Sequence, residues 1–213
     1  MYKVNAVIFD FDGVLIQSVD IKTRAFAELY REFGQGAVDL VVSYHLAHGG
    51  VSRYDKFRHI HNVLIPPPLS ENELAQLVCR FSALVEDAVV EAPWVAGAKE
   101  FLEQNYTLLP MFVASGTPDE ELKRIIGRRG IDRFFMSVHG SPLPKREIID
   151  RIVAKHDYKR DRVVMVGDAM TDYEESKHSG VRFIAKVDLG APSIFPDDVS
   201  VISDLFNLPD FLC

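Results

Sequence analysis

The first apolar run of the chain ends abruptly in acidic residues. Residues 4–9 (VNAVIF) have the length and β-branched content of a buried strand, and Asp10, Asp12 and Gly13 follow it. Open α/β sheets bind ligands beyond the C-terminal ends of their strands. We therefore expect both carboxylates to face one polar crevice, close enough to share a divalent cation. The alternative interpretation is a polar strand end followed by an ordinary turn, because such turns are also rich in Asp and Gly.

A long stretch with helical periodicity comes next. Apolar residues recur at helical intervals over 20–33, and helix-like sequence continues to about residue 90, broken only by three prolines at 66–68. Ser70, with Glu73 three residues later, predicts a fresh helix start. Between residues 16 and 92 no strand pattern is convincing. The sequence predicts an all-helical cap domain over 17–92, inserted into a core made of 1–16 and 93–213.

Short strands and helices alternate after residue 93. The apolar patterns predict strands over 107–114, 134–138, 162–166 and 181–186, and helices over 118–129, 144–155 and 171–178. This alternation predicts an α/β fold, a Rossmann-like three-layer core with a parallel sheet between helices. Because parallel strands end at the same edge, residues that follow each strand should gather near Asp10.

Two of these strand ends carry candidate ligand groups. Ser115 and Gly116 precede a predicted helix, so a hydroxyl, a closely approaching backbone and free amides would form a phosphate cradle. Ser115 and Thr117 would equally serve as a routine helix cap. Asp168 follows the strand over 162–166 and would complete a Mg²⁺ site with Asp10. Asp172 either binds the metal, directly or through water, or caps the next helix.

A lysine follows the strand predicted over 134–138. Lys145 would balance the crowded carboxylates and a phosphate, or it would be an exposed helix residue. No other lysine lies in this segment, and Arg146 is the possible substitute.

Charge and apolar content narrow the choice of partners. The net charge of −7 argues against nucleic acid, because phosphate backbones bind basic surfaces, yet it allows a small phosphorylated substrate. The N-terminal apolar run is too short to span a membrane and lacks the pattern of a signal peptide. Only two cysteines occur, so no disulfide framework is indicated. We expect a cytoplasmic protein without a membrane partner, either a monomer or a weak homodimer.

Taken together, the order of these motifs resembles the haloacid dehalogenase superfamily of aspartate-nucleophile phosphatases. The matching features are Asp-x-Asp-Gly, Ser-Gly-Thr, lysine and Gly-Asp-x-x-x-Asp, each at a predicted strand end. The helical insertion after the first motif is similar to the cap of subfamily I. In many members of that subfamily the lysine precedes a proline, whereas Lys145 follows Pro144 here.

The resemblance implies a mechanism. Asp10 would be the nucleophile that forms an aspartyl-phosphate, and Asp12 the acid and base. Mg²⁺ would be held by Asp10, the Asp12 backbone carbonyl and Asp168. Ser115 and the Gly116 amide would hold phosphate oxygens, and Lys145 would stabilise developing charge. The implied substrate is a small phosphorylated metabolite, either a phosphosugar or a phosphoglycolate-like phosphomonoester.

Three alternatives remain. Dehalogenases of the superfamily lack the second aspartate of the first motif, which this chain keeps as Asp12. A hexose-phosphate mutase of the β-phosphoglucomutase type is a closer rival, since residues 50–53 (GVSR) resemble its substrate-reading segment; that enzyme has a histidine where Lys22 stands here. On this resemblance Arg53 would bind a substrate phosphate or carboxylate, or it would be a solvated helix residue. A non-catalytic phosphate-binding module would need a glycine-rich first turn or a Walker lysine, and the sequence has neither.

Overall fold

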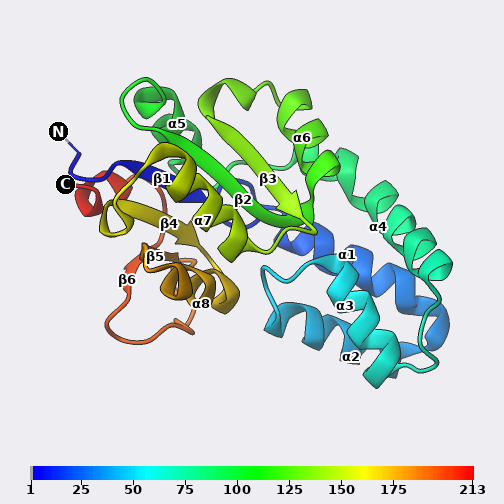
Figure 1. Ribbon diagram of the computed structural model, residues 1–213. Coiled ribbons are helices and arrows are strands. Elements are labelled where there is room, and N and C mark those ends of the chain that lie inside the picture. Colours follow the sequence, from blue (N-terminus) through cyan, green and yellow to red (C-terminus); the bar gives the residue numbers. More distant parts are fainter. Residues whose placement is uncertain (1) are drawn as a thin grey trace.

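The core is a six-stranded parallel sheet. The computed structural model describes residues 2–213, and its strands lie in the order β3-β2-β1-β4-β5-β6 (Figure 1). Their bounds are β1 Ala6–Phe9, β2 Met111–Pro118, β3 Ser137–Ser141, β4 Val163–Gly167, β5 Arg182–Lys186 and β6 Ser200–Ile202. The first strand of the chain is therefore central, and it pairs with β2 on one side and β4 on the other.

Alternation of side chains along β1 divides the core into two layers. Val7 and Phe9 belong to one apolar cluster, while Ala6 and Ile8 belong to the other, as the two-residue period of a strand requires. The first cluster includes apolar residues of α5 (Ala98–Asn105) and α6 (Asp119–Arg128), and the second includes those of α7 (Lys145–His156). With α8 (Met170–Ser179) beside α7, helices cover both faces of the sheet (Figure 1). The predicted Rossmann-like α/β fold is confirmed.

A group of helices stands apart from the sheet. Figure 1 shows these helices packed together at one end of the molecule. They are α1 Val19–Tyr30, α2 Gln35–Ala47, α3 Arg53–His59 and α4 Glu71–Glu91, with a π-helical turn over Ile60–Leu64. Rings of Phe26, Phe57 and Phe81 meet at centroid distances of 4.7 to 5.9 Å and form the centre of this group. None of the helices in residues 2–213 is both long and apolar enough to cross a membrane.

The chain leaves the core and returns to it at neighbouring points. Ile16 forms an antiparallel bridge with Trp94, and the Val95 amide donates to the Leu15 carbonyl at 2.9 Å. The four helices lie between these two crossings. This arrangement supports residues 17–92 as a proposed cap domain, with 1–16 and 93–213 as the proposed core.

Several predicted boundaries were wrong. β2 starts at Met111, after Pro110, and extends to Pro118, so Ser115 and Gly116 are strand residues and α6 begins only at Asp119. β3 starts three residues later than predicted because 132–134 form a 3₁₀ turn. The pattern also missed α5 and the short edge strand β6.

The start of α4 confirms a local prediction and gives a test. Ser70 accepts a hydrogen bond from the Glu73 amide at 3.3 Å, and Glu73 accepts one from the Ser70 amide at 2.8 Å. Ser70→Ala should lower the free energy of unfolding by about 1 kcal/mol, because an amide of the first turn loses its acceptor. Urea unfolding measures this change. Asn72→Ala, at an exposed position in the same turn, is the control, and an equal loss there would contradict the capping role.

Candidate active site

Asp10 lies immediately beyond the central strand. Its amide donates to the Val166 carbonyl of β4 at 2.9 Å, which continues the sheet pairing by one residue. The residue is only 3% exposed. After Asp12 the chain turns at Gly13, whose φ of +78° is readily adopted only by glycine. The strand end and this turn together fix Asp10 at the carboxyl edge of the sheet, as the sequence predicted.

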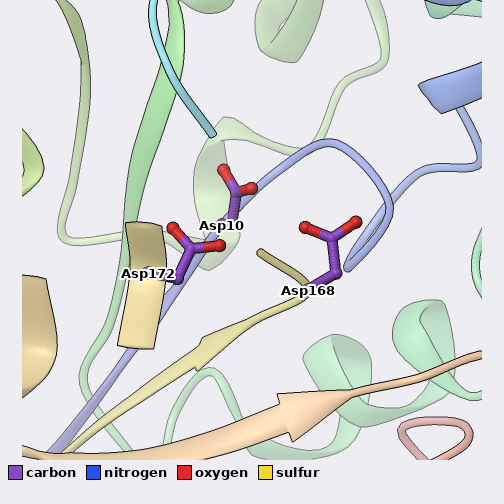
Figure 2. Close-up of side chains that lie close together, drawn as sticks. All are labelled: Asp10, Asp168 and Asp172. Carbon is purple, nitrogen blue, oxygen red and sulfur yellow. The ribbon is translucent and has the colours of Figure 1, made fainter. Parts of the chain in front are cut away.

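Three carboxylates from distant parts of the chain converge at this edge. Asp10 follows β1, Asp168 follows β4, and Asp172 lies in the first turn of α8 (Figure 2). Each offers an oxygen within 4.8 Å of the others. Parallel pairing of β1 with β4 explains this meeting, because both strands deliver the following residues to one edge.

Lys145 is the cation at the centre of this cluster. It begins α7 and is 6% exposed; its Nζ lies 3.0 Å from Asp10 Oδ1 and also contacts Asp172 Oδ1. Burial alone would lower the pKa of Lys145, but the carboxylates of Asp10 and Asp172 outweigh burial and raise it. Lys145 is therefore charged. Arg146 points elsewhere, since its guanidinium lies 3.8 Å from Asp150 on the surface.

One lysine does not neutralise three clustered carboxylates, two of them buried. Burial, followed by repulsion from Asp172 and Asp12, raises the pKa of Asp10 to about 7 despite the opposing effect of Lys145. Burial and the charges of Asp10 and Asp172 likewise raise the pKa of Asp168 well above its usual value. The cluster is therefore short of positive charge, and a hard divalent cation bound by carboxylate oxygens would supply it. The residues present fit the Mg²⁺ site expected from the sequence.

Asp172 has a more limited choice of partners than Asp168. One of its oxygens contacts Lys145, and the other accepts from the Ala169 amide at 3.2 Å. The helix-capping alternative for Asp172 is thus confirmed, and its further contact orients Lys145. Among residues 2–213, no hydrogen-bond donor or cation contacts the Asp168 side chain. Asp168 is therefore the carboxylate with oxygens most open to a metal.

Asp12 has a different environment from Asp10. Ser18 Oγ and Thr117 Oγ1 donate to its carboxylate at 2.6 and 2.9 Å, and Lys22 Nζ forms an ion pair with it. Burial acts to raise the pKa of Asp12, but the charge of Lys22 and these hydrogen bonds lower it to about 2. Two carboxylates two residues apart therefore differ sharply in proton affinity, which suits them to different chemical roles.

The Ser-Gly-Thr segment lies beside Asp12. Ser115 is 1% exposed and its Oγ accepts from the Thr117 amide at 3.1 Å, so the two residues form a tight polar corner at the end of β2. Gly116 faces the Gly50 carbonyl of the cap closely enough that a side chain there would collide with it. The predicted segment reaches the site, although as extended strand rather than as a helix start.

Arg53 lies in the cap, yet it is neither solvated nor free. It is 4% exposed, and its guanidinium forms two 2.7 Å hydrogen bonds with Glu121 of α6 and one of 2.8 Å with Ser82. The alternative of a solvated helix residue was therefore wrong. Because Glu121 occupies both terminal nitrogens, Arg53 joins cap and core in this structure, and contact with a substrate stays a prediction.

A cavity of about 370 Å³ lies between cap and core. Asp10, Asp12 and Asp168 line its core side, and residues of α2 and α3 line its cap side. Thr171 at the start of α8 donates to the Gly49 carbonyl of the cap at 2.8 Å. The cap is thus closed over the carboxylates, and a small molecule bound there would contact both parts.

The sequence interpretation missed several residues of this cavity. That interpretation mentioned Lys22 only as a departure from the mutase sequence. It gave His45 and Lys56 no role at the site. Lys22 stands one helical turn after Ser18, and Lys56 follows Arg53 by three residues, so both share a helix face with a residue near the site. Helical spacing was the only available signal, because the faces that meet the core depend on cap packing.

Fold and site together define a hydrolase-type α/β protein with a carboxylate cluster under a helical cap. The sequence profile of the family described as haloacid dehalogenase-like hydrolase matches residues 7–186. The chain belongs to this family, and the resemblance inferred from its motifs is confirmed.

Individual relatives agree with this assignment. The chain is 24% identical over 187 residues to a phosphoglycolate phosphatase from Synechococcus elongatus, covering 85% of this chain and 83% of that protein. A crystal structure of CbbY from Rhodobacter sphaeroides in complex with phosphate matches with a TM-score of 0.75, 16% identity and 96% coverage of both chains. A predicted phosphoglycolate phosphatase from Haemophilus somnus matches with a TM-score of 0.76, 17% identity and 99% coverage of both chains. These structural matches show a shared fold.

The turn at Gly13 gives a test of the carboxylate geometry. A methyl group at Gly13 would collide with Asp168, whereas Gly190 has a similar φ of +82° and open space around it. Both Gly13→Ala and Gly190→Ala should lose about 1 kcal/mol of stability through backbone strain. Only Gly13→Ala should lower the free energy of unfolding by several kcal/mol in total. In this variant Mg²⁺ should also no longer stabilise the protein. Thermal unfolding with and without Mg²⁺ measures both effects, and equal behaviour of the two variants would contradict this geometry.

The raised pKa of Asp10 predicts a pH-dependent stability. Because the folded protein holds a proton on Asp10 up to about pH 7 and the unfolded chain releases it near pH 4, stability should fall as pH rises through this window. In metal-free buffer, Asp10→Asn should therefore be more stable than the wild type at pH 8, with the advantage shrinking towards pH 4. Urea unfolding across this range measures it. Asp198→Asn, at an exposed position, is the control, and an advantage independent of pH would contradict the prediction.

Proposed function

We propose that this protein is a Mg²⁺-dependent phosphatase that hydrolyses a small phosphomonoester through an aspartyl-phosphate. The observation that carries the proposal is the placement of Asp10. Its buried carboxylate stands beyond β1, 3.0 Å from the Lys145 ammonium, and faces a cavity of about 370 Å³ beneath the cap. The phosphosugar or phosphoglycolate-like substrate expected from the sequence is compatible with this volume, and membership of the hydrolase family supports the reaction class.

Asp10 is the nucleophile in this proposal. The Phe11 amide donates to its Oδ1 at 2.8 Å, and Lys145 contacts the same oxygen, so the carboxylate is fixed before substrate binds. Attack of Asp10 on phosphorus breaks the ester P–O bond and releases the alcohol, which takes up a proton. Lys145 would then offset the negative charge that develops on the transferring phosphoryl group. Ser115 and the Gly116 amide would hold phosphate oxygens.

Asp12 serves the hydrolytic half of the reaction. Its lowered pKa keeps it ionised, so it can take a proton from the water that attacks the aspartyl-phosphate. Phosphate is released and Asp10 is restored. In the first half of the reaction, a proton that Asp12 takes up when the anionic substrate binds would pass to the leaving alkoxide, and this transfer leaves Asp12 ionised for the second half. The hydrogen bonds from Ser18 and Thr117 fix its orientation for both tasks.

Asp10, Asp168 and the Asp12 carbonyl would hold Mg²⁺. The bound ion would offset repulsion between the Asp10 carboxylate and a phosphate dianion. Asp172 would remain with Lys145 and the Ala169 amide.

A phosphomutase of the β-phosphoglucomutase type is the second candidate. The cap segment 50–53 favours it, but two observations oppose it. Lys22 occupies the position of the mutase histidine and is paired with Asp12, and Glu121 occupies the Arg53 guanidinium. Incubation with a hexose 1-phosphate and a bisphosphate primer separates the two functions. If the enzyme forms isomerised product without net release of phosphate, it is a mutase and the phosphatase proposal is wrong.

Hydrolysis of an aryl phosphate tests the nucleophile and the metal. Asp10→Asn should lower kcat by about 10³-fold or more, because the amide cannot form the covalent intermediate. Chelation should abolish wild-type turnover, and added Mg²⁺ should restore it. The control is Asp20→Asn, at an exposed position of α1, which should keep full activity. Full activity of Asp10→Asn would rule out the proposed mechanism.

A further inference from the structure

One buried cation of the cavity has no acidic partner. Among residues 2–213, most of the other cations that are mostly buried pair with carboxylates: Lys22 with Asp12, Arg53 with Glu121, Lys145 with Asp10 and Asp172, and Lys186 with Asp188. Arg129 lies outside this cavity and donates instead to backbone carbonyls of residues 89, 90 and 92. Lys56 of α3 is 3% exposed and makes no ion pair. An isolated buried ammonium is unfavourable, so this position calls for an explanation beyond packing.

Lys56 is held by a histidine of the neighbouring cap helix. Its Nζ lies 2.9 Å from His45 Nδ1 and 3.3 Å from the His45 carbonyl. An ammonium that donates to Nδ1 leaves the imidazole proton on Nε2. Nε2 is buried and has no hydrogen-bond partner among the described residues. His45 therefore orients the Lys56 ammonium, and its own Nε2–H points away from Lys56 on the far side of the ring.

The charges around this pair also favour an anion. Burial, followed by the positive charge of Lys22, lowers the pKa of Lys56 to about 7. Burial and the charge of Lys56 lower the pKa of His45 to about 3, which keeps the imidazole neutral. The negative charges that act on Lys56 most strongly are those of Asp12 and Asp168, which lie on the core side of the cavity. An anion placed beside Lys56 would restore its full charge.

The position of the pair relative to the catalytic carboxylates suggests the ligand. Lys56 and His45 line the cap side of the cavity whose core side is lined by Asp10 and Asp12. With the cap closed and the cavity about 370 Å³ in volume, one small molecule would span both sides. The other cap cations of this cavity are occupied, Arg53 by Glu121 and Lys22 by Asp12. Lys56 is therefore the cap cation left for a substrate.

We propose that Lys56, oriented by His45, binds a second anionic group of the substrate, a carboxylate or a second phosphate, while the scissile phosphate lies at Asp10. This inference rests on the proposed phosphatase function and narrows its substrate class to small phosphomonoesters that carry another negative charge. An uncharged phosphosugar would leave the Lys56 ammonium without a partner. Because Lys56 and Asp10 line the same cavity of about 370 Å³, the second anion must lie close to the phosphate.

Matched substrates test the proposal. We compare kcat/KM for phosphoglycolate with 2-hydroxyethyl phosphate, and for a pentose 1,5-bisphosphate with the pentose 5-phosphate. The wild type should prefer the doubly anionic member of at least one pair by about 10- to 100-fold, as expected for a charged hydrogen bond in a buried site. The pair that shows the preference identifies the second anion as carboxylate or phosphate.

Variants assign the preference to Lys56. Lys56→Met keeps the length and apolar stem but removes the charge, so it should fold and should reduce the ratio within the responding pair to about 1. Lys56→Arg should recover part of the ratio. The control is Arg58→Met, at an exposed position of the same helix, which should leave the ratio unchanged.

The outcomes separate this inference from the phosphatase proposal. Absence of aryl phosphate hydrolysis would defeat the phosphatase proposal, and the inference with it. Normal aryl phosphate hydrolysis without preference for either doubly anionic substrate would overturn the inference alone. So would a preference that Lys56→Met leaves intact.

Discussion

The structure depends on the excess of negative charge at the carboxyl edge of the sheet. Asp10, Asp168 and Asp172 are held together by parallel pairing of β1 and β4 and by the first turn of α8, with Lys145 as their only directly contacting cation among the described residues. Such an arrangement costs folding energy that the two apolar layers of the sheet must offset. The fold thus maintains a site whose charge is completed by bound ligands. That is the property that a phosphoryl-transfer centre requires.

The fold and this edge were largely predictable from sequence because both follow from local rules. A six-residue apolar run, the alternation of later strands and a glycine beside each acidic pair were enough to bring Asp10 and Asp168 together. The Ser70 cap followed from the same kind of local signal. Errors arose where tertiary contacts override propensity, as in β2, which extends through Ser115 and Gly116 because Pro118 still pairs with Ser141 of β3.

The cap side of the site was not predictable in the same way. Arg53 and Lys56 lie three residues apart on α3, yet one pairs with Glu121 of the core and the other with His45 of α2. The difference depends on how α3 lies against α2, α4 and α6, which helical periodicity does not determine. Sequence indicated that a helical insertion exists. Only the packed structure distinguishes a cation that joins the two parts from one left facing the cavity.

The bridge between Ile16 and Trp94 has a consequence for how such a protein diversifies. The two ends of the insertion meet at this bridge, so the core holds them as close together as two hydrogen-bonded strands. A longer, shorter or differently packed insertion would change the cost of loop closure only slowly, since that cost grows with the logarithm of length. The sheet and its carboxylates therefore need not be redesigned when the insertion changes. The catalytic carboxylates of the sheet and the substrate contacts of the insertion can therefore change independently within one continuous chain.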